Sequence, residues 1–132
     1  MKPTTMILAA SLVLAAIPAI AHHSFAAEFD GNKPIRIEGT LSKMEWTNPH
    51  AYFYVDVKDD KGNVVTWGCE GATPGQLTRQ GFRHGEVKIG DKFVVDGYAA
   101  KDGAHLMNAR RIYLNGKAIF GGAEGDGGPG GQ

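Results

Sequence analysis

Two adjacent histidines, His22 and His23, stand where they could bind a metal ion. They follow Ala19-Ile20-Ala21, a small-x-small pattern of the kind that signal peptidase cleaves. Cleavage after Ala21 would make His22 the N-terminal residue, and its α-amine and imidazole Nδ1 could then chelate one metal ion. A second imidazole would complete the T-shaped, three-nitrogen site called a histidine brace. Nitrogen ligands in tetragonal geometry favour Cu(II), so the pattern predicts copper as the cofactor.

Two alternatives to this metal site remain open in the sequence. Ser24-Phe25-Ala26 is also a small-x-small pattern, and cleavage there would remove both histidines. The histidines could also lie on a frayed terminus that binds metal weakly and without a biological role.

Two further histidines are candidates for the missing metal ligand. His50 follows Asn48-Pro49, in the connection between the first two expected strands, and His105 follows the turn between the fourth and fifth. In OB-folds these two connections border the face that binds ligands. We therefore expect His23, His50 or His105 to assist His22.

Alternation along the second and third expected strands places one polar group on the outer face. A hairpin turn at 59–62 brings the end of the third strand opposite the start of the second. The expected group is His50, Tyr52, Tyr54, Thr66 and Glu70. It could hold a metal or stack a planar ligand, or it could be an ordinary β-surface, where tyrosine and threonine are favoured anyway.

Cys69 is the only cysteine, which excludes an intramolecular disulfide and a Cys-x-x-Cys redox pair. Cys69 lies on the same side of its expected strand as Val65 and Trp67, which places it in the core. A blue-copper site with Met44 or Met107 is therefore disfavoured. No Gly-x-Ser-x-Gly, His-Glu-x-x-His or phosphate-loop motif is present. The sequence predicts no catalytic residue and favours a binding module over an enzyme. An enzyme built on the copper brace stays as a further alternative.

The N-terminal 21 residues predict export. Lys2 precedes a 12-residue uncharged run, Met6 to Ile17, which is too short to span a bilayer. We expect residues 1–21 to be a cleaved signal peptide and the mature chain to be periplasmic or secreted, with no membrane span. A retained signal anchor is the alternative. The 14 basic and 14 acidic residues balance, which argues against nucleic acid as a partner.

In residues 22–120, turn-forming residues separate short segments, which is typical of a small all-β domain. Period-2 alternation predicts a long first strand through Ile35 and Trp46, with a bulge at Gly39 or Ser42-Lys43, and further strands at 51–57, 64–70, 93–95 and 106–114. Thr73, Pro74 and Gln76 predict a capped short helix after the third strand. A small terminal hairpin is expected at 118–120, and the Gly-rich residues 121–132 are expected to be disordered.

This order of elements predicts the fold class. Three strands, a short helix and two strands are the order of the OB-fold, a five-stranded Greek-key barrel. An open antiparallel sheet or a small sandwich is the rival architecture.

Several segments resemble a family of small exported bacterial proteins known as a domain of unknown function. They are His22-His23-Ser24-Phe25, the segment from Glu45 to His50, the stretch from Trp67 to Gly71, and Gly90-Asp91-Lys92. The resemblance covers most of residues 22–120 and implies one periplasmic β-barrel domain without an assigned activity. The strand order is also similar, more loosely, to a bacterial periplasmic OB-fold family linked to stress and small-ligand binding.

We therefore expect a periplasmic binding module that holds copper through His22. The alternative is a metal-free module whose second and third strands bind an unknown periplasmic protein or small ligand. In that case His22→Ala would be silent, and removing both Tyr52 and Tyr54 would abolish binding.

Overall fold

The computed structural model describes residues 25–121, which form six strands and two short helices with a 3-10 turn. In chain order these are α1 (Phe25–Glu28), β1 (Phe29–Glu45), β2 (Tyr52–Lys58), β3 (Val64–Glu70), α2 (Pro74–Arg79), η1 (His84–Glu86), β4 (Lys92–Ala100), β5 (Leu106–Leu114) and β6 (Lys117–Phe120). The expected signal peptide, His22, His23 and residues 122–132 lie outside the described residues.

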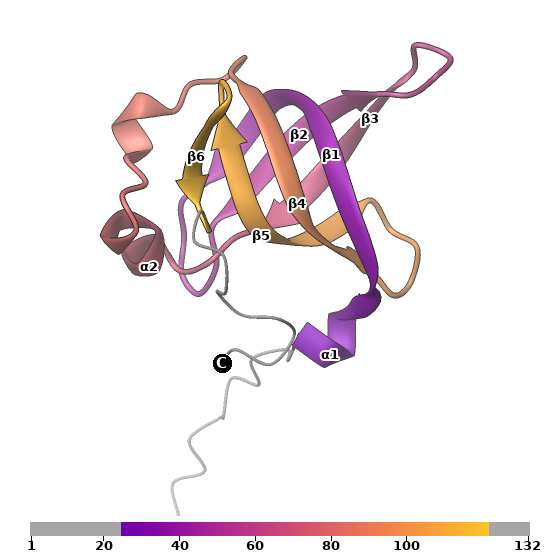
Figure 1. The fold of residues 1–132 in the computed structure, drawn as a ribbon, viewed down its shortest axis with the longest axis horizontal. Coiled ribbons are helices and arrows are strands. Elements are labelled where there is room, and N and C mark those ends of the chain that lie inside the picture. Colours follow the sequence, from indigo (N-terminus) through magenta and orange to yellow (C-terminus); the bar gives the residue numbers. More distant parts are fainter. Residues whose placement is uncertain (1–24, 122–132) are drawn as a thin grey trace, which may run out of the picture.

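Strand pairing closes the sheet into a ring. The antiparallel order is β3-β2-β1-β4-β5-β6, and β3 also pairs in parallel with β5. Figure 1 shows β1, β4 and β5 in front, with β2 and β3 behind. The all-β class is confirmed, as are the five-strand order and the helix between the third and fourth strands. The terminal hairpin is present too, as β6 beside β5.

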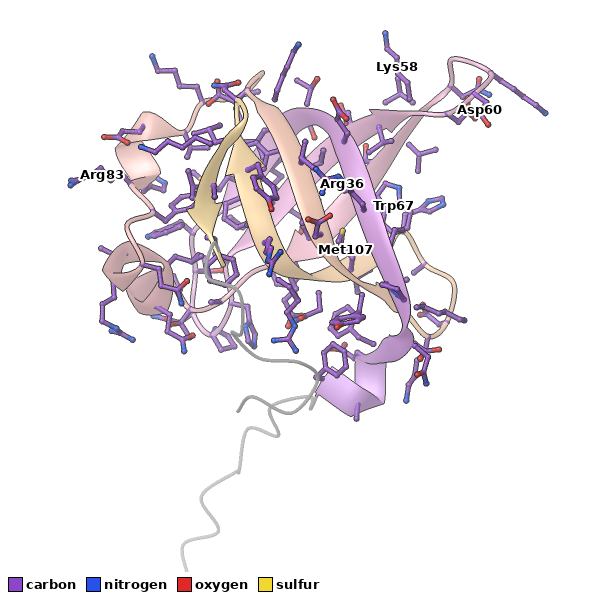
Figure 2. All side chains as sticks on the ribbon, in the orientation of Figure 1. Arg36, Lys58, Asp60, Trp67, Arg83 and Met107 are labelled. Carbon is purple, nitrogen blue, oxygen red and sulfur yellow. The ribbon has the colours of Figure 1, made fainter. Side chains whose placement is uncertain are left out.

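Alternating side chains fill the interior of this ring. The residues that point inward and are fully buried include Phe53, Val55, Cys69, Phe93, Val95 and Met107. Figure 2 shows Met107 within the sheet, whereas Lys58, Asp60 and Arg83 project from the surface. The prediction that Cys69 lies in the core is confirmed. Burial raises the pKa of its thiol to about 12, so Cys69 stays a protonated, unreactive thiol at neutral pH.

The strand pairing shifts register at four places, and two of these bulges decide which side chains of β1 and β5 face the core. The first lies between Leu41 and Lys43 and leaves Ser42 as the extra residue, at a position that the sequence predicts. The second lies opposite Asp96 and Gly97, where Ala109 pairs with Gly97 and Arg111 with Asp96, so that Arg110 is the extra residue. This second bulge explains how Ala109 and Ile112, three residues apart, both face the core.

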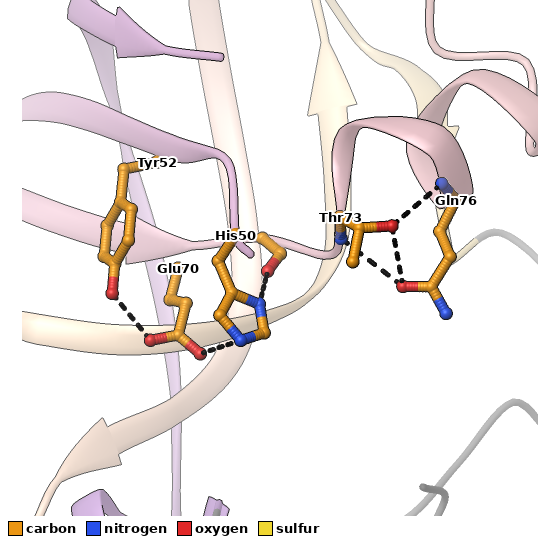
Figure 3. Close-up of polar contacts among 6 residues, drawn as sticks. His50, Tyr52, Glu70, Thr73 and Gln76 are labelled. Atoms are coloured by element: carbon orange, nitrogen blue, oxygen red, sulfur yellow. Dashed lines mark hydrogen bonds and ion pairs between the residues drawn. The ribbon is translucent and has the colours of Figure 1, made fainter. Parts of the chain in front are cut away.

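Helix α2 has the ends that its sequence predicts. Thr73 Oγ1 accepts from the Gln76 amide at 3.1 Å, and Gln76 Oε1 accepts from the Thr73 amide at 3.3 Å, which is a capping box (Figure 3). At the other end Gly81 adopts a φ of 95°, and the Phe82 amide donates to Leu77 O at 2.9 Å. This Schellman motif turns Phe82 back onto the core.

Helix α1 is the main difference from the sequence-based expectation. The described residues begin with α1 at Phe25, and β1 begins at Phe29 rather than near residue 33. A four-residue helix is too short to carry a periodic pattern. Tertiary contacts hold it instead, since Phe29 is buried opposite Ala100 and the Lys101 amide donates to Glu28 O at 2.9 Å.

Among residues 25–121 no helix is long and apolar enough to cross a membrane.

Candidate functional site

A buried carboxylate, Glu70, lies at the centre of the candidate site. It ends β3 opposite Tyr52, the first residue of β2, and only 8% of it is exposed. Tyr52 Oη donates a hydrogen bond of 2.8 Å to Glu70 Oε2 (Figure 3). Because a buried charge is costly without hydrogen-bonding partners, this contact makes the position of Glu70 tolerable.

The third member of the group is His50, which lies in the connection between β1 and β2. Its Nδ1 lies 3.1 Å from Gly71 O, and since a carbonyl can only accept, Nδ1 carries a proton. In the neutral ring Nε2 then bears the lone pair, and this atom lies 3.8 Å from Glu70 Oε1. Metal-ligating histidines commonly donate their other N–H to a backbone carbonyl in this way. An imidazole nitrogen and a carboxylate oxygen thus face each other at a separation that one cation could bridge.

The hydroxyl of Tyr52 is kept protonated by its surroundings. Burial is the largest cause that raises the pKa of Tyr52 well above its usual range, followed by the hydrogen bond to Glu70 and the negative charges of Glu70 and Glu28. Tyr52 therefore remains a hydrogen-bond donor to Glu70. The contribution of Glu28 also indicates that the end of α1 lies within electrostatic range of this group.

The structure brings together three of the five residues expected on the outer face, namely His50, Tyr52 and Glu70. Tyr54 stacks on Tyr52 with ring centroids 6.4 Å apart, but its hydroxyl donates to Glu45 Oε2 at 3.3 Å. Thr66 lies farther along β3, where its hydroxyl donates to Asp56 Oδ1 at 2.6 Å on the exposed surface.

His105 lies beside Trp67 and Gly68 of β3. Its carbonyl accepts from the Gly68 amide at 2.9 Å, and its ring lies 5.1 Å from that of Trp67. His50 instead contacts Gly71, which lies three residues after Gly68 in the chain. His50 and His105 are therefore not neighbours, and no group of three His, Cys, Asp or Glu residues placed to hold a metal occurs within the described part of the chain.

Four residues outside the group expected on the outer face extend the site across β5 and β4 to α1. Asn108 pairs with Glu70, and Tyr98 pairs with Asn108, so all three share the outer face. The Phe25 ring packs edge-on against Tyr98 at 5.5 Å, and the Arg110 guanidinium lies 5.2 Å from the Phe25 centroid. Simple alternation could not reveal Arg110, because the bulge beside it resets the parity of β5.

Comparison with known proteins places the chain in a family. Residues 9–108 match a family of unknown function, DUF6152, and the chain belongs to it. No curated protein matches the chain. Among solved structures, the mitochondrial single-stranded DNA-binding protein Rim1 of S. cerevisiae is similar at 13% identity, with a TM-score of 0.49, over 62% of this chain and 92% of that one.

Proposed function

We propose that this DUF6152 protein is an exported binding module that holds one Cu(II) between its mature N-terminal His22 and the His50–Glu70 pair. The observation that carries the proposal is the 3.8 Å separation of His50 Nε2 and Glu70 Oε1, with His50 Nδ1 placed to donate to Gly71 O. The pair supplies two ligands, and the amine and imidazole of His22 would supply two more. Four such ligands suit the tetragonal preference of Cu(II).

Chain length is compatible with this assembly. Tyr98, Asn108 and Glu70 occupy facing positions on three neighbouring strands, and two strand spacings amount to about 10 Å. Phe25 rests on Tyr98, and the three residues back to His22 can extend about 11 Å. His22 is thus within covalent reach of Glu70.

The same contact favours cleavage after Ala21. Cleavage after Ala26 would remove Phe25 and with it the packing against Phe29, Tyr98 and Arg110. The packing of Phe25 on the domain therefore supports cleavage after Ala21, which would leave His22 as the first residue of the mature chain.

Electrostatics also favour a cation at this place. Glu70 is a buried acid, and Glu28 adds a second negative charge within range of Tyr52. The α-amine of an N-terminal residue has a pKa near 7.7–8.0, so a metal can displace its proton at neutral pH.

The metal-free alternative, docking of a partner on Tyr52 and Tyr54, has less support. Both hydroxyls are engaged within the chain, with Glu70 and Glu45 as acceptors.

The test is native mass spectrometry of protein exported with its own signal, combined with EPR after one equivalent of Cu(II). We expect a mass that begins at His22 and one retained copper. Loss of one ligand in His50→Ala or Glu70→Gln should weaken copper binding by at least tenfold, whereas His105→Ala serves as the matched control and should bind as the wild type does. A chain that begins at Ala27, or one that retains no copper, would contradict the proposal.

A further inference from the structure

A cavity of about 280 Å³ lies between the α2–η1 segment and the hairpin of β5 and β6. Figure 1 shows this segment beside β6, at one side of the ring of strands. Gln80 and Val87 line one wall, and Leu114 and Ile119 line the other. No residue of the proposed copper site lines the cavity, so it is a separate feature that the proposed function does not use.

Contacts within the chain hold both walls of the cavity in place. Val87, Leu114 and Ile119 are partly buried and pack against the hydrophobic core. Gln80 Oε1 accepts from the Gly121 amide at 3.5 Å, which joins the end of α2 to the end of β6. The cavity is therefore formed without a ligand, and apolar side chains make up part of its surface.

Strand β6 brings a free backbone donor to this cavity. Its only neighbour among the described strands is β5, so its other edge is unpaired. Asn115 and Gly116 both have positive φ angles, 47° and 85°, as a two-residue type I′ turn requires. The residues beside such a turn, Leu114 and Lys117, exchange both of their backbone hydrogen bonds. The next residue, Ala118, therefore directs its N–H away from β5, and it lines the cavity.

The charged residues of the cavity leave one positive charge unpaired. Arg83 Nε and Glu86 Oε1 lie 3.7 Å apart, and Figure 2 shows Arg83 projecting from the surface. Lys117 also lines the cavity, is exposed, and has no ion-pair partner within residues 25–121. Its ammonium adjoins the Ala118 N–H in the chain. Two such donors, one of them charged, suit an anionic oxygen acceptor.

We propose that this cavity binds a small organic carboxylate with an apolar body. Lys117 and the Ala118 N–H hold the carboxylate, and Val87, Leu114 and Ile119 contact the apolar body. The cavity volume is about nine times that of a water molecule in the liquid. It is close to the lower end of the range usual for small-molecule sites. The ligand therefore has about ten non-hydrogen atoms, the size of octanoate.

Addition of a peptide strand to the free edge of β6 fits the cavity less well. A further strand needs an open path about 4.8 Å wide along the whole edge. The α2–η1 segment already lies beside this edge, and Gln80 crosses the path by bonding to Gly121. Natural sheets protect an edge strand by covering it in this way, which leaves room for a small molecule only.

The first experiment is a titration of the full exported chain, without added copper, with sodium octanoate, followed by ¹⁵N–¹H NMR. We expect a Kd of about 0.1–1 mM, with the largest shifts at the amides of Val87 and Ala118. Butyrate should bind about 10–100-fold more weakly because it has four fewer methylenes to bury. Dodecanoate should gain no more than about threefold over octanoate, since the cavity is then full. 1-Octanol, which lacks the carboxylate, should bind at least about fivefold more weakly than octanoate.

The second experiment repeats the octanoate titration with variants of the carboxylate site. Lys117→Gln should weaken binding of octanoate about two- to fivefold and leave that of 1-octanol unchanged. Lys88→Gln is the matched control, because Lys88 is an exposed lysine beside Val87 that does not line the cavity. Ala118→Pro removes the N–H that faces away from β5, a position where an edge strand tolerates proline, and it should weaken binding by a similar factor.

Equal octanoate affinity in the wild type, Lys117→Gln and Ala118→Pro would overturn the proposal. Shifts centred on amides outside the cavity, or affinity that rises steadily from butyrate to dodecanoate, would overturn it as well. The titrations contain no copper, so their outcome is independent of the copper proposal.

Discussion

At the scale of single residues, the pairing of Tyr52 with Glu70 makes the protein sensitive to alkaline pH. The pKa of Tyr52 is raised above its ordinary value near 10, chiefly by burial and then by Glu70. The folded state thus holds this proton more tightly than the unfolded chain does. The resulting stability is present below about pH 10 and is lost as the pH rises above that value.

This predicts that the free energy of unfolding, measured by urea titration, falls as the pH rises above about 10. Tyr52→Phe should remove part of that fall, because it removes the proton that is released. Glu70→Gln should reduce it, since the carboxylate charge contributes to the shift. Identical pH profiles in the wild type and Tyr52→Phe would show that another group is responsible.

At the scale of elements, the bulge on β5 depends on one glycine. A Cβ at Gly97 would lie 1.9 Å from the backbone oxygen of Asn108, a clash that no side-chain movement can relieve. Gly97 therefore allows β4 and β5 to approach closely at the point where Arg110 is turned out of register.

We predict that Gly97→Ala lowers the free energy of unfolding by about 3 kcal/mol or more, because the strands must separate. Gly85→Ala is the matched control, since it has no atom within 4 Å of the added Cβ and should change stability by no more than about 0.5 kcal/mol. Urea titration of both variants provides the measurement. Equal stability of the two variants would mean that the bulge can relax at little cost.

At the scale of the whole molecule, the ring of strands closes through one short pairing, the seam between β3 and β5. Strands β3 and β5 meet over three residue pairs, whereas β1 and β4 pair at eight positions. The seam is also the only parallel pairing within residues 25–121. Local opening with few broken contacts requires less free energy than global unfolding.

Native-state hydrogen exchange should therefore detect opening of the seam first. The Gly68 amide, which donates to His105 O across it, should exchange through a lower free energy than amides in the middle of β1 and β4. Protection of Gly68 equal to that of the most protected amides would mean that the ring opens only by global unfolding.

The sequence by itself determined the features that depend on local periodicity and local backbone chemistry. Alternation placed Phe53, Val55 and Cys69 inward, and Thr73, Gln76 and Gly81 specified both ends of α2. The hairpin turn at 59–62 also determined that Glu70 faces Tyr52, which is half of the candidate site.

Only the tertiary structure decided the rest, because those features depend on contacts between distant segments. The β3–β5 pairing that closes the ring joins two strands that do not follow each other in the chain. This pairing places His105 beside Trp67, away from His50. The contacts among Phe25, Tyr98 and Arg110 depend on a four-residue helix and on a bulge opposite Gly97. A one-residue shift in pairing changes which face a side chain occupies, and only the partner strand determines that register.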